Sequence, residues 1–471
     1  MGLFKSIENY KDNIALISNS TGPITYNNLI EKINIIKKNI PERSLIFLIA
    51  QNTVAPLIGY ISSIKNNCVI MLVDIKTNDA DVTNLINKYE PSFLIAPNDW
   101  IKNYKEIKFE FLENIYDYSV CRTLFKVSIN IHDDLCVLLP TSGSMGSPKF
   151  VRLSKENLKA NADSIIKYLE INSKERAITN MPYSYSYMLS IINTFIEAGG
   201  SIFVSNHSVT QKEFWNEFRE NNISSLSGVP YIYEIFIKLG LNNIYIPSLK
   251  MLTQAGGKLN QKSTEKIIDF CNNNNLKFIS MYGQTEASPR MTYLNWQDCS
   301  KKIGSIGKAI PFTDIWLENN NGEKIKNSNE IGELIFRGKN VSMGYSNTIS
   351  DLTKGDENRG ILKTGDLAYF DNEGYFYIKG RKNRIIKIFG NRFNLDEIEE
   401  RMKQNNLDVA CKDINDKLFI FHEKKFLSEN VLNKISEITD QNKIAFKCIA
   451  IDKLPRTTSG KIDYLKLKIN A

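Results

Sequence analysis

Residues 135–169 read LCVLLPTSGSMGSPKFVRLSKENLKANADSIIKYL, and this stretch is the clearest indication of the fold. It begins with a short apolar run, Leu135–Leu139, which is typical of a buried strand. Ser154 is a suitable N-cap for the helix that follows. The apolar residues of that helix recur at helical spacing: Leu158, Ala162, Ile165, Ile166 and Leu169. The stretch therefore predicts a strand, a loop of small residues and a helix.

The same alternation of strand and helix patterns continues on both sides of this stretch. Strands are predicted at 44–50, 68–74, 93–96, 201–204, 224–228 and 278–281, and helices at 52–65 and near 211–221. Repeated strand–helix units indicate an α/β fold, in which parallel or mixed sheets are covered by helices.

From about residue 330 the pattern changes to short strands separated by turns. The segments GELIFRG and LAYFDNEGYFYIKG predict a small β subdomain, with a hairpin turn at 372–374. A last unit carries a predicted helix at 396–403, a strand at 417–422 and a helix at 429–438. We therefore expect a large N-terminal domain over residues 1–381, which includes the β subdomain, and a small mobile α+β domain over residues 382–471.

Composition excludes several classes of protein. With 471 residues, 42% hydrophobic and 24% charged, the chain is expected to be globular with two or more domains. The net charge of +8 is scattered, so no nucleic-acid partner is expected. Seven widely spaced cysteines and three histidines indicate neither a disulfide framework nor a zinc site. Without a long apolar segment, we expect no stable membrane anchor and a cytoplasmic location.

Three segments carry chemistry. In Pro140–Lys149, small residues allow the backbone to approach phosphate oxygens and Lys149 adds a positive charge, although a Ser/Gly-rich connector is the alternative interpretation. In YGQTE, 282–286, a hydroxyl and a carboxylate follow a strand and suit phosphate and Mg²⁺. In LKTGD, 362–366, a carboxylate beside a glycine can accept hydrogen bonds from both ribose hydroxyls.

These segments, taken in order, resemble the ANL superfamily of adenylate-forming enzymes: acyl-CoA synthetases, adenylation domains of peptide synthetases and luciferases. The resemblance covers nearly the whole chain. Five segments carry it: TSGSMGSPK (141–149), YGQTE (282–286), GELIFRGKNVSMGY (332–345), LKTGDLAYFDNEGYFYIKGRKNRIIKIFGNRFNLDEIE (362–399) and PRTTSGKID (455–463).

The resemblance implies a reaction in two steps. A carboxylate attacks the α-phosphate of Mg·ATP and forms an acyl-adenylate, and a thiol of CoA or of carrier-protein phosphopantetheine then takes the acyl group. The C-terminal domain is implied to rotate about a hinge at 381–383 between the steps. The implied cofactors are ATP and Mg²⁺, and an acyl carrier protein is a candidate partner.

The resemblance also implies a role for individual residues. Residues implied to bind phosphate are Thr141, Ser142, Gly143, Ser144, Gly146 and Lys149. Residues implied to lie along the adenine and the adjoining turn are Gly256, Gly257, Tyr282 and Gly283. Asp366 and Arg381 are implied to hold the ribose. Thr285 is implied to contact the α-phosphate, Glu286 to hold Mg²⁺, and Lys461 to bridge the substrate carboxylate and the α-phosphate. Independently of any family, a lysine that enters a closed site would offset the repulsion between two reacting anions.

Three positions depart from the family pattern. Met145 replaces a usual threonine of the phosphate loop, Asn383 replaces a usual Asp or Lys of the hinge, and Tyr464 stands where an arginine often follows the catalytic lysine. These changes, with a short C-terminal domain, bear on the thioester step more than on ATP binding.

The segment PYSYSYML, 182–189, matches the region that lines the acyl pocket in the family. Amino-acid-activating relatives place an aspartate where Ser186 stands here, and a buried ammonium without a carboxylate is costly. We therefore expect a small carboxylic acid without an α-amino group. The interpretation is an acid–thiol ligase of the AMP-forming acyl-CoA or acyl-carrier-protein synthetase class. The alternatives are an amino-acid adenylating enzyme and a non-catalytic nucleotide-binding paralogue.

Overall fold

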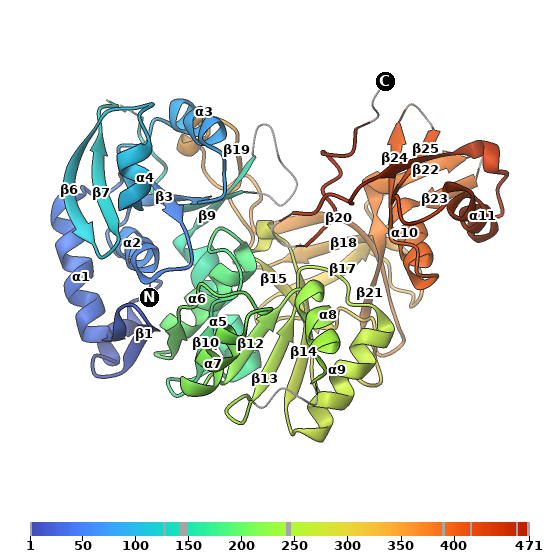
Figure 1. Cartoon of the computed structure of the whole chain (residues 1–471), viewed down its shortest axis with the longest axis horizontal. Helices are drawn as coiled ribbons and strands as arrows, with labels where there is room; N and C mark the ends of the chain where they lie inside the picture. The colour runs from blue at the N-terminus through green and yellow to red at the C-terminus, as the bar shows by residue number, and fades with distance from the viewer. Residues whose placement is uncertain are drawn as a thin grey trace. The chain divides into compact units, whose positions relative to one another are not determined.

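The computed structural model describes residues 2–125, 129–140, 149–241, 246–388, 391–414, 417–457 and 460–468. The chain divides into two compact units (Figure 1). Unit 1 comprises Met1–Gly304, Ala309–Asp314 and Arg337–Leu362, and unit 2 comprises Ser305–Lys308, Ile315–Phe336 and Lys363–Ala471. Most of the small β subdomain is thus grouped with the C-terminal segment, and the boundary at residues 381 and 382 stays a prediction.

An eight-stranded sheet in unit 1 has the order β19-β9-β8-β4-β3-β5-β7-β6. Its strands are β3 (Leu45–Ala50), β4 (Val69–Asp74), β5 (Phe93–Pro97), β6 (Phe109–Ile115), β7 (Tyr118–Thr123), β8 (Leu135–Pro140), β9 (Phe150–Ser154) and β19 (Gly344–Ser346). The central strands β5, β3, β4 and β8 are parallel, and the outer pairs are antiparallel. All six residues of β3 are buried, as expected for a central strand covered on both faces.

The opening stretch of sequence folds differently from the prediction at one point. Strand β8 and helix α5 (Lys155–Leu169) form as predicted, and the Ser154 hydroxyl accepts from the Asn157 N–H in a capping box. Between them the structure inserts β9, antiparallel to β8. The sequence pattern missed β9 because two buried polar residues, Arg152 and Ser154, interrupt its apolar run.

A nine-stranded sheet in unit 1 has the order β16-β15-β14-β13-β12-β10-β11-β1-β2. Its strands are β1 (Ile14–Ser18), β2 (Gly22–Thr25), β10 (Arg176–Ile178), β11 (Ser201–Phe203), β12 (Ser225–Gly228), β13 (Met251–Gln254), β14 (Lys277–Gly283), β15 (Arg290–Leu294) and β16 (Lys308–Ala309). Six neighbouring strands in the middle of this sheet run parallel to one another; in sheet order they are β14, β13, β12, β10, β11 and β1. Their carboxyl ends therefore meet at one edge of the sheet.

Helices connect the strands of both sheets (Figure 1). Besides α5 they are α1 (Tyr26–Asn39), α2 (Val54–Lys65), α3 (Asp79–Tyr89), α4 (Asn98–Asn103), α6 (Ser186–Glu197), α7 (Lys212–Glu220), α8 (Pro230–Leu239) and α9 (Gln261–Asn273). Helix α2 is buried from Val54 to Ile64, as its nearly continuous apolar sequence requires. In the described residues, no helix has the length and apolarity to cross a membrane.

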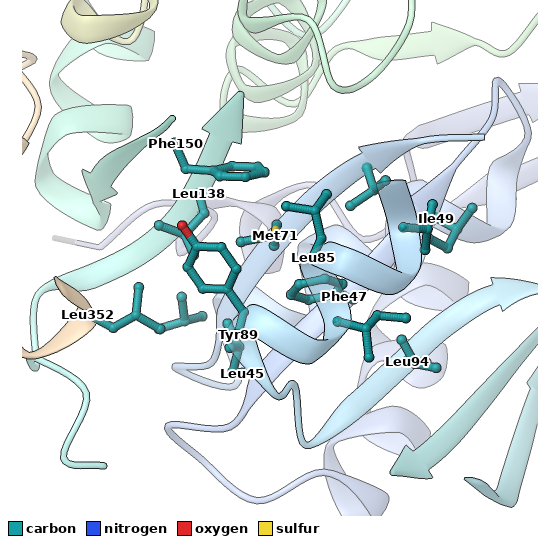
Figure 2. Packing of buried hydrophobic residues seen from close by; sticks show 14 of the residues in the cluster. Leu45, Phe47, Ile49, Met71, Leu85, Tyr89, Leu94, Leu138, Phe150 and Leu352 are labelled. Carbon is teal, nitrogen blue, oxygen red and sulfur yellow. The ribbon is translucent and has the colours of Figure 1, made fainter. Parts of the chain in front are cut away.

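The core of the eight-stranded sheet contains aromatic and aliphatic side chains from strands and from α3 (Figure 2). Tyr89 packs edge-on against Phe150, with ring centroids 5.7 Å apart. Its hydroxyl reaches the Ser346 carbonyl at 3.2 Å, so this buried phenol is satisfied. Leu352, from the segment after β19, joins the same cluster. This packing fixes the segment that carries Tyr345.

Unit 2 contains a four-stranded sheet with the order β17-β18-β20-β21. Its strands are β17 (Asp314–Glu318), β18 (Gly332–Arg337), β20 (Ile361–Phe370) and β21 (Phe376–Arg381). The predicted hairpin is confirmed, because β20 and β21 are antiparallel around a turn in which Gly374 has φ 78°.

The rest of unit 2 has its own core, formed mainly by residues of α10, α11 and a three-stranded sheet. Its elements are β22 (Ile385–Ile388), β23 (Asn391–Asn394), α10 (Leu395–Gln404), β24 (Val409–Ile414), β25 (Lys417–Glu423), α11 (Ser428–Thr439) and β26 (Phe446–Ile451). The predicted helices at 396–403 and 429–438 and the strand at 417–422 are confirmed within one or two residues.

Candidate active site

The candidate site in unit 1 lies at the carboxyl ends of β12, β13 and β14. The strands are in register, with Gly228 opposite Gln254 and Gln254 opposite Ser280. The segments after them therefore start at the same edge of the sheet. In parallel α/β sheets, ligands bind at this edge.

The turn after β13 contains two of the predicted adenine-site residues, Gly256 and Gly257. Gly256 has φ 83°, and a β carbon there would lie 2.3 Å from the Tyr185 hydroxyl oxygen. Only glycine therefore fits between β13 and the segment before α6. Gln254 fixes the turn, because its Nε2 donates to the Gly257 carbonyl at 2.7 Å.

The YGQTE segment reverses direction immediately after β14. A β carbon on Gly283 would lie 1.9 Å from the Pro289 carbonyl oxygen, and the Gln284 N–H donates to that same oxygen at 2.9 Å. The tight loop holds Thr285 and Glu286 in one short 3₁₀ turn. Tyr282 precedes the loop, and its hydroxyl accepts from the Gln284 side-chain amide at 3.3 Å.

Glu286 receives a hydrogen bond from a residue to which the sequence assigned no role. The Tyr345 hydroxyl donates to Glu286 Oε1 at 2.9 Å. The predicted phosphate-binding Lys149 lies over the same ring, with Nζ 3.5 Å from the centroid. Two predicted residues, Lys149 and Glu286, are therefore brought together by Tyr345. The sequence held one signal for a role of Tyr345, because this residue ends the GELIFRGKNVSMGY motif.

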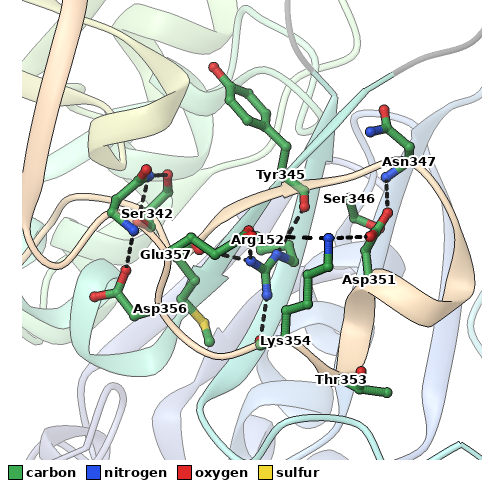
Figure 3. A network of polar contacts seen from close by, with 12 residues as sticks. Arg152, Ser342, Tyr345, Ser346, Asn347, Asp351, Thr353, Lys354, Asp356 and Glu357 are labelled. Atoms are coloured by element: carbon green, nitrogen blue, oxygen red, sulfur yellow. Dashed lines mark hydrogen bonds and ion pairs between the residues drawn. The ribbon is translucent and has the colours of Figure 1, made fainter.

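A buried arginine holds Tyr345 in place (Figure 3). The Arg152 Nε donates to the Tyr345 carbonyl at 3.0 Å, and its NH2 group donates to the Met343 carbonyl at 2.8 Å. Its charge is paired with Glu357 at 2.5 Å, and the Lys354 carbonyl accepts a further hydrogen bond. Strand β9 thus positions the segment that contacts Glu286.

The predicted acyl-pocket segment lies next to the YGQTE loop. Ser186 is the first residue of α6, and its hydroxyl is 3.1 Å from the Thr285 hydroxyl. Tyr185 and Tyr187 are its neighbours in the chain. Their rings meet edge-on, with centroids 6.3 Å apart. Burial raises the pKa of both phenols above the ordinary value, so their hydroxyls stay neutral.

The residues around Glu286 fit a magnesium ion that is shared with substrate phosphates. In the described part of the chain, no group of three or more His, Cys, Asp or Glu residues is arranged to hold a metal. Mg²⁺ usually keeps several waters and binds through one or two carboxylates together with phosphate oxygens. A single carboxylate at Glu286, beside a lysine suited to phosphate, matches that mode of binding.

In unit 2, the two predicted ribose-binding residues form an ion pair. Asp366 on β20 and Arg381 on β21 are opposite each other, and Arg381 Nε lies 3.2 Å from Asp366 Oδ1. The Asp366 side chain is 6% exposed and the Arg381 side chain 54% exposed. A cleft of about 310 Å³ is lined by Thr364, Gly365, Arg381 and Lys382. The pair therefore lies beside an open cleft.

Lys461 follows a tight turn in unit 2. Its carbonyl accepts from the Thr457 N–H at 2.8 Å, and Arg456 forms a β-bridge with Ile462 across the turn. The lysine is exposed at the end of this turn. The predicted phosphate-loop residues Thr141, Ser142, Gly143, Ser144, Met145 and Gly146 lie outside the described residues, so their roles stay predictions.

Comparison with known proteins identifies one enzyme family and several related ligases. A family model described as AMP-binding enzyme matches residues 3–346. Oxalate–CoA ligase from Saccharomyces cerevisiae is 25% identical over 399 residues, which cover 81% of this chain and 70% of that protein. D-alanine–D-alanyl carrier protein ligase from Staphylococcus haemolyticus is 25% identical over 431 residues, or 86% of this chain and 85% of that protein.

Solved structures of o-succinylbenzoate CoA synthetase from Bacillus subtilis share the fold. The complex with its acyl-adenylate intermediate has a TM-score of 0.79 and 19% identity, and the alignment covers 100% of this chain and 99% of that one. The complex with ATP and magnesium has a TM-score of 0.79 and 20% identity, and covers 99% of both chains. The α/β fold predicted from the sequence is confirmed.

Proposed function

The chain belongs to the AMP-binding enzyme family, and we infer that it is an AMP-forming acid–thiol ligase. It activates a carboxylic acid with ATP and then transfers the acyl group to a thiol. In the first step a carboxylate oxygen bonds to the α-phosphorus and pyrophosphate leaves. In the second step the thiol sulfur bonds to the acyl carbon and AMP leaves. The resemblance to adenylate-forming enzymes that the motifs indicated is correct.

The contact between Ser186 and Thr285 is the observation that supports the proposed chemistry most directly. It brings the acyl-pocket segment within 3.1 Å of a hydroxyl suited to the α-phosphate. Glu286, the next residue, is oriented by Tyr345. We assign Thr285 to the α-phosphate and Glu286 to Mg²⁺. The ion, when bound, neutralises negative charge on the ATP phosphates.

The remaining predicted residues are assigned by the same reasoning. We assign Lys149 to the phosphates, which is supported by its position over the ring of Tyr345, the residue whose hydroxyl donates to Glu286. The glycine turn at 256–257, with Tyr282, is assigned to adenine. The Asp366–Arg381 pair is assigned to the ribose, because a carboxylate can accept hydrogen bonds from hydroxyls and the pair lies beside an open cleft. Lys461 is assigned to the carboxylate and α-phosphate during adenylation.

The acid is proposed to lack an α-amino group. Ser186 offers a hydroxyl where an ammonium would need a carboxylate, and burying an unpaired ammonium is costly. The acceptor is proposed to be CoA or carrier-protein phosphopantetheine. Both kinds of ligase occur among the relatives, so the acceptor must be measured directly.

Carboxylate-dependent exchange of pyrophosphate into ATP tests the first step. The expected result is exchange with one class of acid, dependent on Mg²⁺ and lost in Glu286→Ala. Exchange with amino acids alone would favour the amino-acid adenylating alternative. The absence of exchange with every acid, in protein that binds ATP, would favour a non-catalytic paralogue. Acyl transfer to CoA, compared with transfer to a phosphopantetheinylated carrier protein, then identifies the acceptor.

A further inference from the structure

Arg290, the first residue of β15, is a buried cation whose contacts are all to neutral groups. The residue is 2% exposed. Its Nε donates to the Ser190 hydroxyl at 3.1 Å, and its guanidinium carbon lies 4.3 Å from the Tyr187 ring centroid. The Met281 sulfur accepts a further hydrogen bond, and the Tyr168 hydroxyl is another hydrogen-bonding partner of the guanidinium. Within the described ranges, no aspartate or glutamate forms an ion pair with it.

This environment is unusual for a buried arginine. A guanidinium is always charged, and removing it from water is costly unless an anion or several strong acceptors replace the water. Two neutral hydroxyls, of Ser190 and Tyr168, a thioether and an aromatic face are weak substitutes for an anion. Arg152, which is equally buried, has a carboxylate at 2.5 Å and backbone carbonyls around it (Figure 3). The folded protein alone therefore leaves the charge of Arg290 unbalanced.

The position of Arg290 relates it to the acyl substrate. Its partners Ser190 and Tyr187 are on α6, the helix whose first residue, Ser186, contacts Thr285. Residues four apart lie on the same face of a helix, about 6 Å apart along its axis. Arg290 also directly follows the loop that holds Thr285. It thus lies about one helical turn from the reacting end of the site.

We propose that Arg290 binds a second acidic group of the substrate, so that the enzyme activates short dicarboxylic acids. This inference rests on the proposed ligase function. One carboxylate would react beside Thr285, and the other would pair with the guanidinium, whose planar donors match a carboxylate. The same charge would repel an amino-acid ammonium, which agrees with the serine at position 186.

The test compares pyrophosphate exchange for matched acids. Saturated diacids of three to eight carbons are each compared with their half-amide, which keeps the size but removes the distal charge, and with the monoacid of equal length. In the unaltered enzyme, kcat/KM for the best diacid should exceed that of its half-amide at least tenfold. Arg290→Gln should bring this ratio close to one, whereas Arg290→Lys should retain part of it. Arg122→Gln, which removes a surface charge, should keep the original ratio.

A second readout does not depend on turnover. The best diacid, added with ATP analogue, should raise the melting temperature of the unaltered protein and of Arg122→Gln but not of Arg290→Gln. If monoacids exchange as well as diacids in the unaltered enzyme, this inference is wrong while the ligase function stands. An equal loss of activity on all acids in Arg290→Gln, with ATP affinity retained, would also overturn it. Exchange with none of the acids would overturn the ligase function and this inference together.

Discussion

The Tyr464 hydroxyl donates a hydrogen bond of 2.5 Å to Glu399 Oε2. The other oxygen of that carboxylate accepts from Arg384 at 2.7 Å and from the Cys411 N–H at 2.6 Å. The Arg384 guanidinium lies over the Tyr464 ring, 4.1 Å from its centroid. Within unit 2, this cluster joins the segment that follows Lys461 to the segment that follows the predicted hinge. Tyr464, noted in the sequence as a departure from the family pattern, is thus an integral part of the unit.

Glu399 should make the stability of unit 2 depend on pH. Burial raises the pKa of this carboxyl to about 7, although Arg384 and the hydrogen-bond donors oppose the rise. The pKa of Glu399 in the folded state exceeds its ordinary value. The contribution of this group to the free energy of unfolding is therefore complete below about pH 4.5 and is lost as the pH rises through 7. Glu399→Gln should therefore reduce the loss of stability between pH 5 and 8. Hydrogen exchange of the β24 amides, compared at both pH values, measures this.

The matched control for that experiment is Glu437→Gln, which changes an exposed glutamate on α11. It should retain the pH dependence of the unaltered protein. An unchanged dependence in Glu399→Gln would mean that another group titrates.

Tyr345→Phe should weaken the use of Mg·ATP. The change removes the hydroxyl that donates to Glu286 but keeps the ring beneath Lys149. A hydrogen bond to a charged group contributes about 1.5–3 kcal/mol, which corresponds to an increase of roughly ten- to a hundredfold in the Mg²⁺ concentration for half-maximal exchange. Tyr116→Phe, at an exposed tyrosine, should leave that concentration unchanged. The role assigned to Tyr345 fails if the Mg²⁺ dependence does not move.

Gly283→Ala should disrupt the YGQTE loop. The new methyl group would lie 1.9 Å from the Pro289 carbonyl, so the backbone has to move. Because Thr285 and Glu286 follow directly, exchange activity should fall at least a hundredfold, the scale for losing a preorganised electrostatic group. The control is Gly355→Ala, where the nearest atom beyond the chain neighbours is a His132 ring nitrogen at 3.3 Å. Near-normal exchange in a folded Gly283→Ala enzyme would contradict the loop's proposed role.

Asp366→Ala should weaken ATP binding and slow both half-reactions. The change removes the carboxylate proposed for the ribose and leaves Arg381 without its 3.2 Å partner. Loss of two hydrogen bonds to a charged acceptor should lower ATP affinity by about a hundredfold or more. Isothermal calorimetry with ATP measures the change directly. Normal ATP affinity in this variant would rule out the ribose assignment.

Lys461→Ala should separate the two half-reactions. Acyl-adenylate formation should fall by about 10²–10³, the scale for losing one preorganised electrostatic donor. Thiol transfer from preformed acyl-adenylate should be retained, because the resemblance implies that the lysine serves adenylation alone. Each half-reaction is measured separately in single-turnover assays. Equal impairment of both steps, or of neither, would refute the alternating mechanism for this chain.

The sequence by itself determined the elements and the motifs, since both depend on residues close together in the chain. Helical spacing placed α2, Ser154 marked the start of α5, and the aromatic strands around residues 372–374 predicted a hairpin. The ordered motifs also identified the family. Strand β9 was missed because Arg152 and Ser154, which are polar although buried, interrupt its apolar run.

Only the tertiary structure decided which distant residues meet. Tyr345 contacts Glu286 although the two are 59 positions apart in the sequence, and Ser186 contacts Thr285 although they are 99 positions apart. The spacing of nearby residues predicts neither contact, because each depends on how the sheets and helices pack against one another. The same holds for Arg290, because the residues next to it in the sequence do not predict whether its guanidinium is paired with a carboxylate. Its burial among neutral side chains is a property of the folded core, where removal from water makes an unpaired charge costly.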